Sequence, residues 1–420
     1  MGAVSEWQPI KVDVIDVERC PATISGAPNY SALWALIRER GRPRGMVKIP
    51  FDGAELSGER LAEAIATLPA QPDLPPLARP QGGRLPSISV VIPSMLERLD
   101  GLRACLDSLA ELDYPDYEVI VVDNRPADAS PFGTAGARVV REPLSGISAA
   151  RNRGLAAAGG EIIAFTDDDV EVDPAWLLAI ALRLLAHPEE ACVTGLTLPR
   201  ELETTAQIEL EEYYGGFGLR TFEPISHRLR VAPSPKAILS PATVDAFGED
   251  GGTRRSFSLY ATGSFGHGAN MAFRTQVLRD LGGFDVALGT GTPTCGGEDL
   301  AMFARLIWRG DSVGFEPAAL VHHTHRRDGD GLRRQIEGYG IGWGALLLAL
   351  ALEDHRHVGR MLGTVPRGVR AMGNGYRQRL RSAHSEQLTS PRTPELARLE
   401  LHGIAAGPMR YMRSRYRSTR

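Results

Sequence analysis

Short apolar segments alternate with amphipathic segments between residues 88 and 166, and this alternation limits the possible folds more than any other feature of the chain. β-Branched apolar runs predict strands at residues 88–92, 117–122, 138–140 and 161–166. Apolar residues at helical spacing and terminating glycines predict helices at residues 97–110 and 147–158. Elements in this order predict an α/β fold of Rossmann-like type, with a mostly parallel sheet and flanking helices.

The predicted strands end in polar residues, and the ligands of parallel sheets bind at the carboxyl ends of strands. These residues are Pro93 and Ser94 after the first strand, Asp123 and Asn124 after the second, and Asp167, Asp168 and Asp169 after the fourth. Clustered carboxylates repel one another unless a cation or solvent compensates, and Mg²⁺ and Mn²⁺ prefer oxygen ligands. We therefore expect a metal and nucleotide site here, with a solvated acidic turn as the alternative.

A proline- and glycine-rich stretch, residues 71–86, favours an extended linker and divides the chain. Residues 1–70 before it are expected to form a small α+β accessory module for docking or dimerisation. The elements expected in this module are strands at residues 11–17 and 46–50 and helices at residues 30–40 and 57–67. After the linker we expect the α/β domain at residues 87–328 and a helical C-terminal extension at residues 329–420.

Composition excludes some classes of protein. The net charge of −4 provides no field suited to nonspecific nucleic-acid binding, so no nucleic-acid partner is expected. The four cysteines lie far apart, which indicates neither a disulfide framework nor a zinc site and fits a reducing cytoplasm. No signal-peptide core is present at the start, and the apolar run at residues 345–352 is too short to span a bilayer. A cytoplasmic protein is expected, with peripheral contact to the inner face of the membrane left open.

Five segments together resemble the family-two glycosyltransferases, which have the GT-A fold. They read SISVVIPSMLER, YEVIVVDN, GISAARNRGLAAAGGEIIAFTDDDVEVDPAWL, GHGANMAFRTQVLRDLGGFD and GGEDLAMFARLIWRG, and they fall within residues 87–325. The resemblance implies transfer of a sugar from a nucleotide-sugar donor to an acceptor hydroxyl, with inversion at the anomeric carbon. It also implies a divalent cofactor, Mn²⁺ or Mg²⁺.

The resemblance assigns donor-side roles to several residues. Pro93 and Asp123 match positions that contact the nucleobase, with Ser94 beside them, and Arg151 lies in a segment near the donor. Asp167 and Asp169 match the D-x-D motif, in which the first aspartate reaches the ribose or sugar and the last binds the metal. Asp168 is expected to point the other way, because alternate residues of an extended segment face opposite sides.

The resemblance also assigns the acceptor side. Asp299, after Glu298, matches the catalytic base, and the alternative for both carboxylates is helix capping. His323 is expected to complete the metal site, with a polar strand end as the alternative. Asn270 lies in a segment that in relatives is under the donor or acceptor sugar, and a turn role is equally compatible. Trp176 and Trp308 occur among leucines at helical spacing and are expected in the core.

Two stretches depart from the family pattern. Ser94 to Arg98 reads SMLER after Pro93, and Asn124 to Asp128 reads NRPAD after Asp123, so a UDP-sugar is only the preferred donor. The Q-x-x-R-W motif of processive synthases is missing, which predicts a nonprocessive enzyme of hexosyltransferase type. The acceptor is left open among a glycan, a lipid-linked molecule and a small molecule. Residues 201–262 are expected to form the mobile region of the enzyme that faces the acceptor. A homo-oligomer is left open.

The end of the chain is rich in arginine and tyrosine. These residues are Arg410, Tyr411, Arg413, Arg415, Tyr416, Arg417 and Arg420. The pattern favours a solvated or disordered tail, and the alternatives are contact with an anionic membrane, a phosphorylated lipid acceptor or a partner protein.

Two other functions compete with sugar transfer. A sugar-nucleotide pyrophosphorylase shares the metal site, but the chain lacks the glycine-rich, lysine-bearing loop after the first strand that this class uses. A catalytically silent glycan-binding or scaffold protein could keep the same fold. The presence of Asp167, Asp169 and Asp299 favours the transferase over this silent protein.

Overall fold

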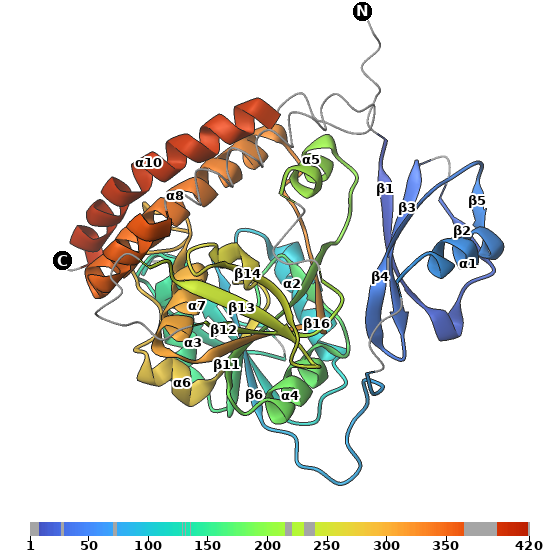
Figure 1. Cartoon of the computed structure of the whole chain (residues 1–420), viewed down its shortest axis with the longest axis horizontal. Coiled ribbons are helices and arrows are strands. Elements are labelled where there is room, and N and C mark those ends of the chain that lie inside the picture. Colours follow the sequence, from blue (N-terminus) through green and yellow to red (C-terminus); the bar gives the residue numbers. More distant parts are fainter. Residues whose placement is uncertain are drawn as a thin grey trace, which may run out of the picture.

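The computed structural model of the protein describes residues 8–26, 29–69, 74–127, 129–130, 132–134, 136–214, 221–230, 240–364 and 393–418. An 11-stranded sheet forms the centre of the molecule, with helices packed around it and a smaller sheet at one side (Figure 1). The predicted α/β architecture is therefore confirmed, including the helical region near the C-terminus.

The central sheet mixes parallel and antiparallel pairs. Its strands are β6 (Ile88–Ser94), β7 (Tyr117–Asp123), β8 (Arg138–Arg141), β9 (Ile162–Phe165), β10 (Val170–Val172), β11 (Glu190–Pro199), β12 (Ile225–Leu229), β13 (Thr243–Gly248), β14 (Thr253–Ser258), β15 (Met271–Arg274) and β16 (Ser312–His323). The strand order is β14-β13-β12-β16-β11-β15-β9-β6-β7-β8, and β10 pairs with β16. Strands β9, β6, β7 and β8 run parallel, as the sequence predicts.

Helices cover both faces of the sheet. They are α2 (Leu99–Ala110), α3 (Ile147–Ala157), α4 (Trp176–Ala186), α5 (Thr205–Tyr214), α6 (Thr275–Asp280) and α7 (Glu298–Arg309). Side chains of β6 alternate between two hydrophobic clusters, because successive residues of a strand face opposite sides. Val91 packs on the side of α3 and α7, whereas Val90 and Ile92 pack on the side of α2 and α4.

The parallel register sets the position of the polar strand ends. Ser94, the last residue of β6, pairs with Asp123, the last residue of β7. Strand β9 lies on the other side of β6, with Phe165 paired to Val91, and the aspartate triplet follows directly. Three strand ends therefore meet at one edge of the sheet, as their sequence pattern predicts.

Part of the region expected to be mobile, residues 201–262, forms regular structure. Its described residues contribute α5 and the antiparallel strands β12, β13 and β14, which extend the sheet beyond β16. Residues 215–220 and 231–239 of this region lie outside the described part of the chain.

The smaller sheet belongs to the N-terminal region. Its elements are β1 (Ile10–Asp16), the 3₁₀ turn η1 (Val17–Arg19), β2 (Thr23–Ser25), β3 (Ala32–Glu39), β4 (Arg42–Pro50), β5 (Glu55–Ser57) and α1 (Gly58–Ala66). The helix predicted at residues 30–40 is wrong, because β3 occupies this place between β1 and β4. Leu33 and Ile37 face the core of this region and Leu36 faces the central domain, so both sides of β3 are apolar. A strand that is apolar on both sides lacks the alternation of apolar and polar residues by which a strand is recognised in a sequence.

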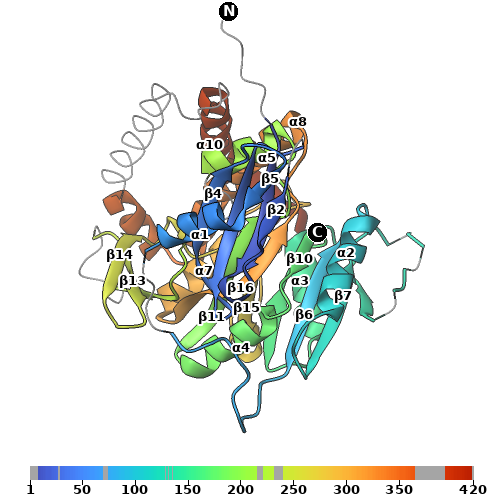
Figure 2. The same cartoon turned by 90° about the vertical axis from the view of Figure 1, so that its right-hand side faces the viewer.

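This N-terminal sheet packs against the central domain (Figure 2). Leu36 lies in one apolar cluster with Leu198 and Phe315 of the central sheet. Arg38 Nη1 donates to Asp173 Oδ2 at 2.7 Å, and Ile10 N donates to Leu202 O at 2.8 Å. The contact combines apolar packing with paired polar groups, so we propose that residues 1–70 are a fixed accessory module.

Two long helices form the C-terminal region. Helices α8 (Gly329–Glu353) and α10 (Thr393–Ser418) lie side by side along one flank of the molecule (Figure 1). The expectation of a disordered tail is therefore wrong for residues up to Ser418, and Arg420 lies outside the described residues. Of the described helices, α8 alone has the length and composition to cross a membrane, and half of its most apolar window is buried inside the structure.

Glycines allow these helices to approach closely. A Cβ atom on Gly344 of α8 would lie 2.2 Å from Ile404 O of α10, and one on Gly407 would lie 2.5 Å from Ile341 O. Both obstacles are backbone atoms, which cannot rotate away. The contact therefore depends on the absence of side chains at these positions.

We expect Gly344→Ala to destabilise the protein by about 1–3 kcal/mol, because the methyl group overpacks a backbone contact, although alanine favours a helix by about 1 kcal/mol. The midpoint of thermal unfolding measures this change. Ala405→Val, on the exposed side of α10, is the matched control and should cost less than about 1 kcal/mol. Equal effects of the two substitutions would contradict the importance of the close contact.

Candidate active site

The aspartate triplet lies where β9 ends and the chain turns into β10. Ser94 Oγ donates to Asp168 Oδ2 at 2.6 Å, and Arg98 Nη2 donates to Asp168 Oδ1 at 2.9 Å. Arg98 Nη1 also donates to Asp169 Oδ2. Asp168 thus fixes the end of β6 to the triplet, and the guanidinium of Arg98 compensates two of the three carboxylates.

Asp169 faces His323, the last residue of β16. His323 Nε2 lies 3.4 Å from Asp169 Oδ1, and a chain of ring contacts continues from His323 Nδ1 to His325 Nδ1 at 3.2 Å. His325 Nε2 then contacts Glu211 Oε1 of α5 at 2.7 Å. Burial lowers the pKa of His323 to about 4, so its imidazole is neutral near pH 7. Burial opposes ionisation of Asp169, but His323 and Arg98 outweigh it and lower the pKa of this carboxyl.

Asp167 faces Arg151 of α3 instead. Arg151 Nη2 lies 3.5 Å from Asp167 Oδ1 and donates to Gly268 O at 3.1 Å, while Arg151 Nη1 donates to Glu298 Oε1 at 2.6 Å. The Arg151 side chain is only 1% exposed. Burial, Asp169 and Asp168 raise the pKa of Asp167 to about 6, although Arg151 opposes them.

Glu298 and Asp299 begin α7 but have different surroundings. Glu298 is buried, and among the described residues its Oε2 atom has no hydrogen-bond partner. Burial, together with Asp299, raises the pKa of Glu298 to about 7. Asp299 is partly exposed, and its Oδ2 atom accepts a hydrogen bond from Gly268 N at 2.6 Å.

The start of α7 is fixed by the C-terminal region. Gly297, just before the helix, has a φ of 92°, and a Cβ atom there would lie 2.5 Å from Gly342 O of α8. A side chain would therefore both strain the backbone and collide with α8. Helix α8 thus determines the position of the two carboxylates that follow Gly297.

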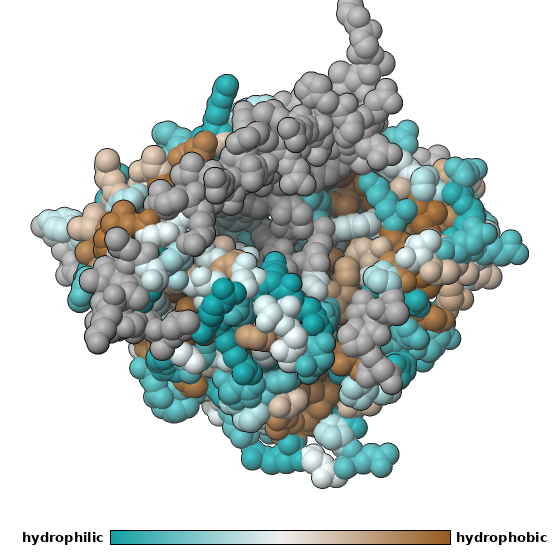
Figure 3. Space-filling model, in the orientation of Figure 1, coloured by the Kyte–Doolittle hydropathy of each residue, from teal (hydrophilic) through white to brown (hydrophobic). Residues whose placement is uncertain are grey.

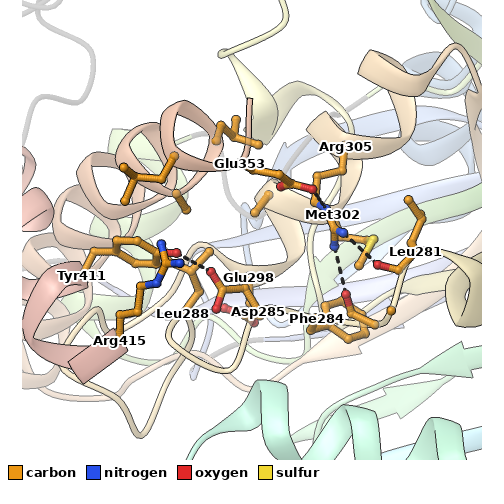
Figure 4. Close-up of a pocket in the computed structure, with 16 residues that line it drawn as sticks. Leu281, Phe284, Asp285, Leu288, Glu298, Met302, Arg305, Glu353, Tyr411 and Arg415 are labelled. Carbon is orange, nitrogen blue, oxygen red and sulfur yellow. Dashed lines mark hydrogen bonds and ion pairs between the residues drawn. The ribbon is translucent and has the colours of Figure 1, made fainter. Parts of the chain in front are cut away.

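A cavity of about 370 Å³ reaches Glu298 from the side of the C-terminal helices (Figure 4). It lies between the segment 281–288, α7, α8 and α10. Tyr411 Oη donates to Asp285 Oδ2 at 2.7 Å, and Arg305 Nε donates to Glu353 Oε1 at 2.8 Å. The first pair holds α10 against the loop that carries Asp285, and the second joins α7 to the end of α8.

Asp123, at the end of β7, is enclosed by arginines. Its Oδ1 accepts hydrogen bonds from the backbone N and the Nε of Arg125 at 3.2 and 2.9 Å. Its Oδ2 accepts from Arg125 Nη2 at 2.9 Å and from Arg141 Nη1 at 3.1 Å. A carboxylate offers about four lone-pair sites, so this carboxylate has its full set of partners. Hydrogen bonds from Arg125 lower the pKa of Asp123.

The remaining predicted residues differ in their position. Pro93 lies in β6, next to Ser94, and is partly exposed at the same sheet edge. Asn270 is 1% exposed; its Oδ1 accepts from Trp176 Nε1 at 2.9 Å, and its Nδ2 donates to Ala319 O at 2.8 Å. The structure therefore uses Asn270 to tie β11, α4 and β16 together and does not bring its side chain to the aspartates. Trp176 is in the core, as expected.

The side chains around Asp169 offer few ligands for a divalent cation. Within the described ranges, no group of three or more His, Cys, Asp or Glu side chains is placed to hold a metal. Asp169 and His323 nevertheless face each other at 3.4 Å, close to the spacing of about 3 Å between neighbouring ligands of an octahedral ion. Mg²⁺ commonly takes one or two protein carboxylates and completes its shell with water and substrate phosphate. Two protein ligands therefore fit a site that a diphosphate would complete.

Three features of this site were missed from the sequence. Arg98 was noted only as a departure from the family pattern, although it bonds to Asp168 and Asp169. Glu211 lies far from His325 in sequence and carries no local motif. The backbone of Gly268 holds both Arg151 and Asp299, which the glycine in GHGAN could have suggested.

Comparisons with known proteins agree with the motifs. Residues 89–282 match the model of glycosyl transferase family 2. The chain is 31% identical over 253 residues to the pre-mycofactocin glycosyltransferase of Mycobacterium tuberculosis, an alignment that covers 59% of this chain and 44% of that protein. It is 35% identical over 103 residues to the glycosyltransferase AglE of Haloferax volcanii, covering 22% of this chain and 34% of AglE.

Among solved structures, the chain is similar to the mannosyltransferase PcManGT of Pyrobaculum calidifontis, solved with GDP-Man and Mn²⁺. That similarity has a TM-score of 0.45 at 18% identity and covers 78% of this chain and 88% of PcManGT. The chain spans less than half the length of each of the two curated relatives described above. Residues 89–282, which match the model of glycosyl transferase family 2, include the aspartate triplet and the strands before it.

Proposed function

We propose that the protein is a divalent-metal-dependent, inverting glycosyltransferase that moves one sugar from a nucleotide-sugar donor to an acceptor hydroxyl. The observation that carries this proposal is the grouping of Asp167 and Asp299 around Arg151 and the Gly268 backbone, with Asp169 acting on Asp167 from the same triplet. This grouping places donor-side and acceptor-side carboxylates next to each other. The match of residues 89–282 to the family model supports the same chemistry.

Asp299 is the proposed base. Its carboxylate is partly exposed and lies at the start of α7, where its Oδ2 atom accepts a hydrogen bond from Gly268 N. The hydroxyl oxygen of the acceptor attacks the anomeric carbon, and Asp299 takes the hydroxyl proton. The bond from the anomeric carbon to the diphosphate breaks in the same step, so the configuration inverts.

The donor side uses other residues. Asp169 and His323 would hold Mn²⁺ or Mg²⁺, which when bound lowers the energy of the departing diphosphate as a Lewis acid. Asp167 orients the ribose or sugar and is itself held by Arg151. Ser94 and Asp168 fix the end of β6, and Pro93 lines the base side. Asp123 acts through Arg125 and Arg141, which present donors to the base.

Glu298 has a positioning role in this scheme. It is buried against Arg151, so it orients the guanidinium that also faces Asp167. A UDP-sugar is the preferred donor, and the acceptor is a glycan, a lipid-linked molecule or a small molecule. We propose that the enzyme works in the cytoplasm.

Asp299→Asn should lower the rate of sugar transfer at least about 100-fold, because an amide cannot accept the proton. Release of nucleoside diphosphate from a panel of UDP-, GDP- and dTDP-sugars, with and without Mn²⁺, measures the rate. Asp280→Asn, on the exposed part of α6, is the matched control and should leave the rate unchanged.

A wild-type rate in Asp299→Asn would exclude Asp299 as the base. If the wild-type protein turns over no donor with any metal, a catalytically silent glycan-binding or scaffold protein is favoured. Formation of a nucleoside triphosphate from donor and pyrophosphate would instead identify a sugar-nucleotide pyrophosphorylase.

His323→Ala and Asp169→Asn should each weaken Mn²⁺ binding in the presence of nucleoside diphosphate by at least about 10-fold. Electron paramagnetic resonance of free Mn²⁺ measures this directly and needs no turnover. His322→Ala is the control, because His322 precedes His323 on β16 and its side chain points to the opposite face. A similar loss in His322→Ala, or none in the other two, would disprove the assignment.

The raised pKa of Glu298 makes stability depend on pH. A carboxyl whose pKa is about 7 in the folded protein and 4.5 when unfolded binds more protons when folded, so its contribution falls as the pH rises from about 4.5 to 7. Glu298→Gln should remove this loss while keeping a hydrogen bond to Arg151. We expect the variant to match the wild type at pH 5 and to exceed it at pH 8 by about 1–3 kcal/mol. Urea unfolding at a series of pH values tests this, and a constant difference would refute it.

A further inference from the structure

The outer face of α10 carries a row of large apolar side chains. Leu401, Met409 and Met412 are 51%, 79% and 52% exposed, and Tyr416 continues the row at 59%. With Ala405, these positions recur every three to four residues, which places them on one side of the helix. Exposed methionines and leucines in a continuous row are uncommon on a free protein surface.

The opposite face of α10 is fixed to the protein. Gly403 and Gly407 contact the backbone of α8, and Tyr411 is buried with its hydroxyl bonded to Asp285. The orientation of the helix is therefore set by packing, and the apolar row points outward. Figure 3 shows brown and teal surface side by side on the flank that α8 and α10 form.

Arginines border the apolar row on one side. On a helical projection Arg413 and Arg417 lie along this edge, whereas Arg415, on the other side, lines the cavity near Glu298. Residues 401–418 contain no aspartate or glutamate. The outer face is thus an apolar strip with a positive border and no negative charge of its own.

We propose that this face of α10 binds in plane to an anionic membrane surface. The apolar row would enter the boundary between headgroups and acyl chains, and the bordering arginines would pair with lipid phosphates. The chemistry argues against a second copy of the same face, because two such faces would bring arginines together without a carboxylate between them. The inference does not depend on the proposed glycosyltransferase activity.

This arrangement also fixes the position of a bound membrane relative to the candidate active site. Helix α10 packs on α8, and α8 contacts Gly297 immediately before Glu298 and Asp299. A membrane bound to α10 would therefore lie at a constant position relative to α7.

Cosedimentation of the purified full-length chain with vesicles tests the proposal. The vesicles contain phosphatidylcholine, alone or with about 30% phosphatidylglycerol, at low salt and at about 0.5 M salt. We expect at least about 10-fold stronger binding to the anionic vesicles, weakened by high salt. Binding to neither kind of vesicle would overturn the proposal.

Two variants separate the contributions of the face. One combines Leu401→Ser, Met409→Ser and Met412→Ser, and the other combines Arg413→Gln and Arg417→Gln. All of these side chains are exposed, so the thermal midpoint should stay near that of the wild type. Each variant should lose most of the vesicle binding, about 10-fold or more.

A matched control changes the same kinds of residue elsewhere. It combines Leu185→Ser on α4, where the leucine is 50% exposed, with Arg103→Gln and Arg138→Gln, whose side chains are 70% and 58% exposed. This control should bind vesicles as the wild type does. Equal loss in the control would mean nonspecific adsorption, and unchanged binding in both α10 variants would refute the assignment. If light scattering finds a dimer that the serine variant abolishes while vesicles do not bind, the face is a protein interface.

Turnover of the nucleotide-sugar donor by the same proteins in solution is a separate measurement. The α10 variants should keep it, since none of their residues touches the candidate active site. Loss of vesicle binding with retained turnover, or the reverse, therefore shows which of the two proposals fails.

Discussion

The buried guanidinium of Arg151 is the interaction on which the candidate site depends. It contacts Glu298 at 2.6 Å, the Gly268 carbonyl at 3.1 Å and Asp167 at 3.5 Å, and its carbon lies 5.6 Å from the centre of the Phe284 ring. A buried charge destabilises the folded protein unless neighbouring groups compensate it. Removing one partner of Arg151 would leave a buried charge without full compensation. Arg151 therefore joins the end of β9 to the start of α7, and Asp167 and Glu298 cannot move independently.

The same dependence extends beyond the segment that matches the family. Asp299 follows Gly297, which can take its positive φ and its close contact with α8 only because it has no side chain. Helix α8 is in turn held by α10 through glycine contacts, so these two helices form the packing surface behind the proposed base. A transferase domain that ended at residue 328 would leave this start of α7 without its packing surface.

Much of this arrangement could be predicted from the sequence, because it depends on local pattern. The β-branched runs of β6, β7 and β9 and the polar residues after them needed only strand periodicity and the rule for strand ends. The strand β3 could not be told from a helix, since both of its faces are buried. Asn270 looked like a ligand, but its amide bonds to Trp176 and two backbone carbonyls. Arg98 and Glu211 reach the site through tertiary contacts that no local pattern records, and α10 is fixed by α8 rather than by its own composition.

Asp123 shows how its neighbours determine what a motif residue can bind. Asp123 is 2% exposed, and its oxygens accept four hydrogen bonds, three from Arg125 and one from Arg141. A base that donated a hydrogen bond to this carboxylate would have to displace one of the arginines and leave its charge without a partner. In the proposed function, recognition at this strand end therefore uses the guanidinium groups, which only donate, and favours a base edge that accepts hydrogen bonds. The NRPAD stretch after β7 thus changes the chemistry at the end of the strand and leaves the backbone of the sheet as the family pattern predicts.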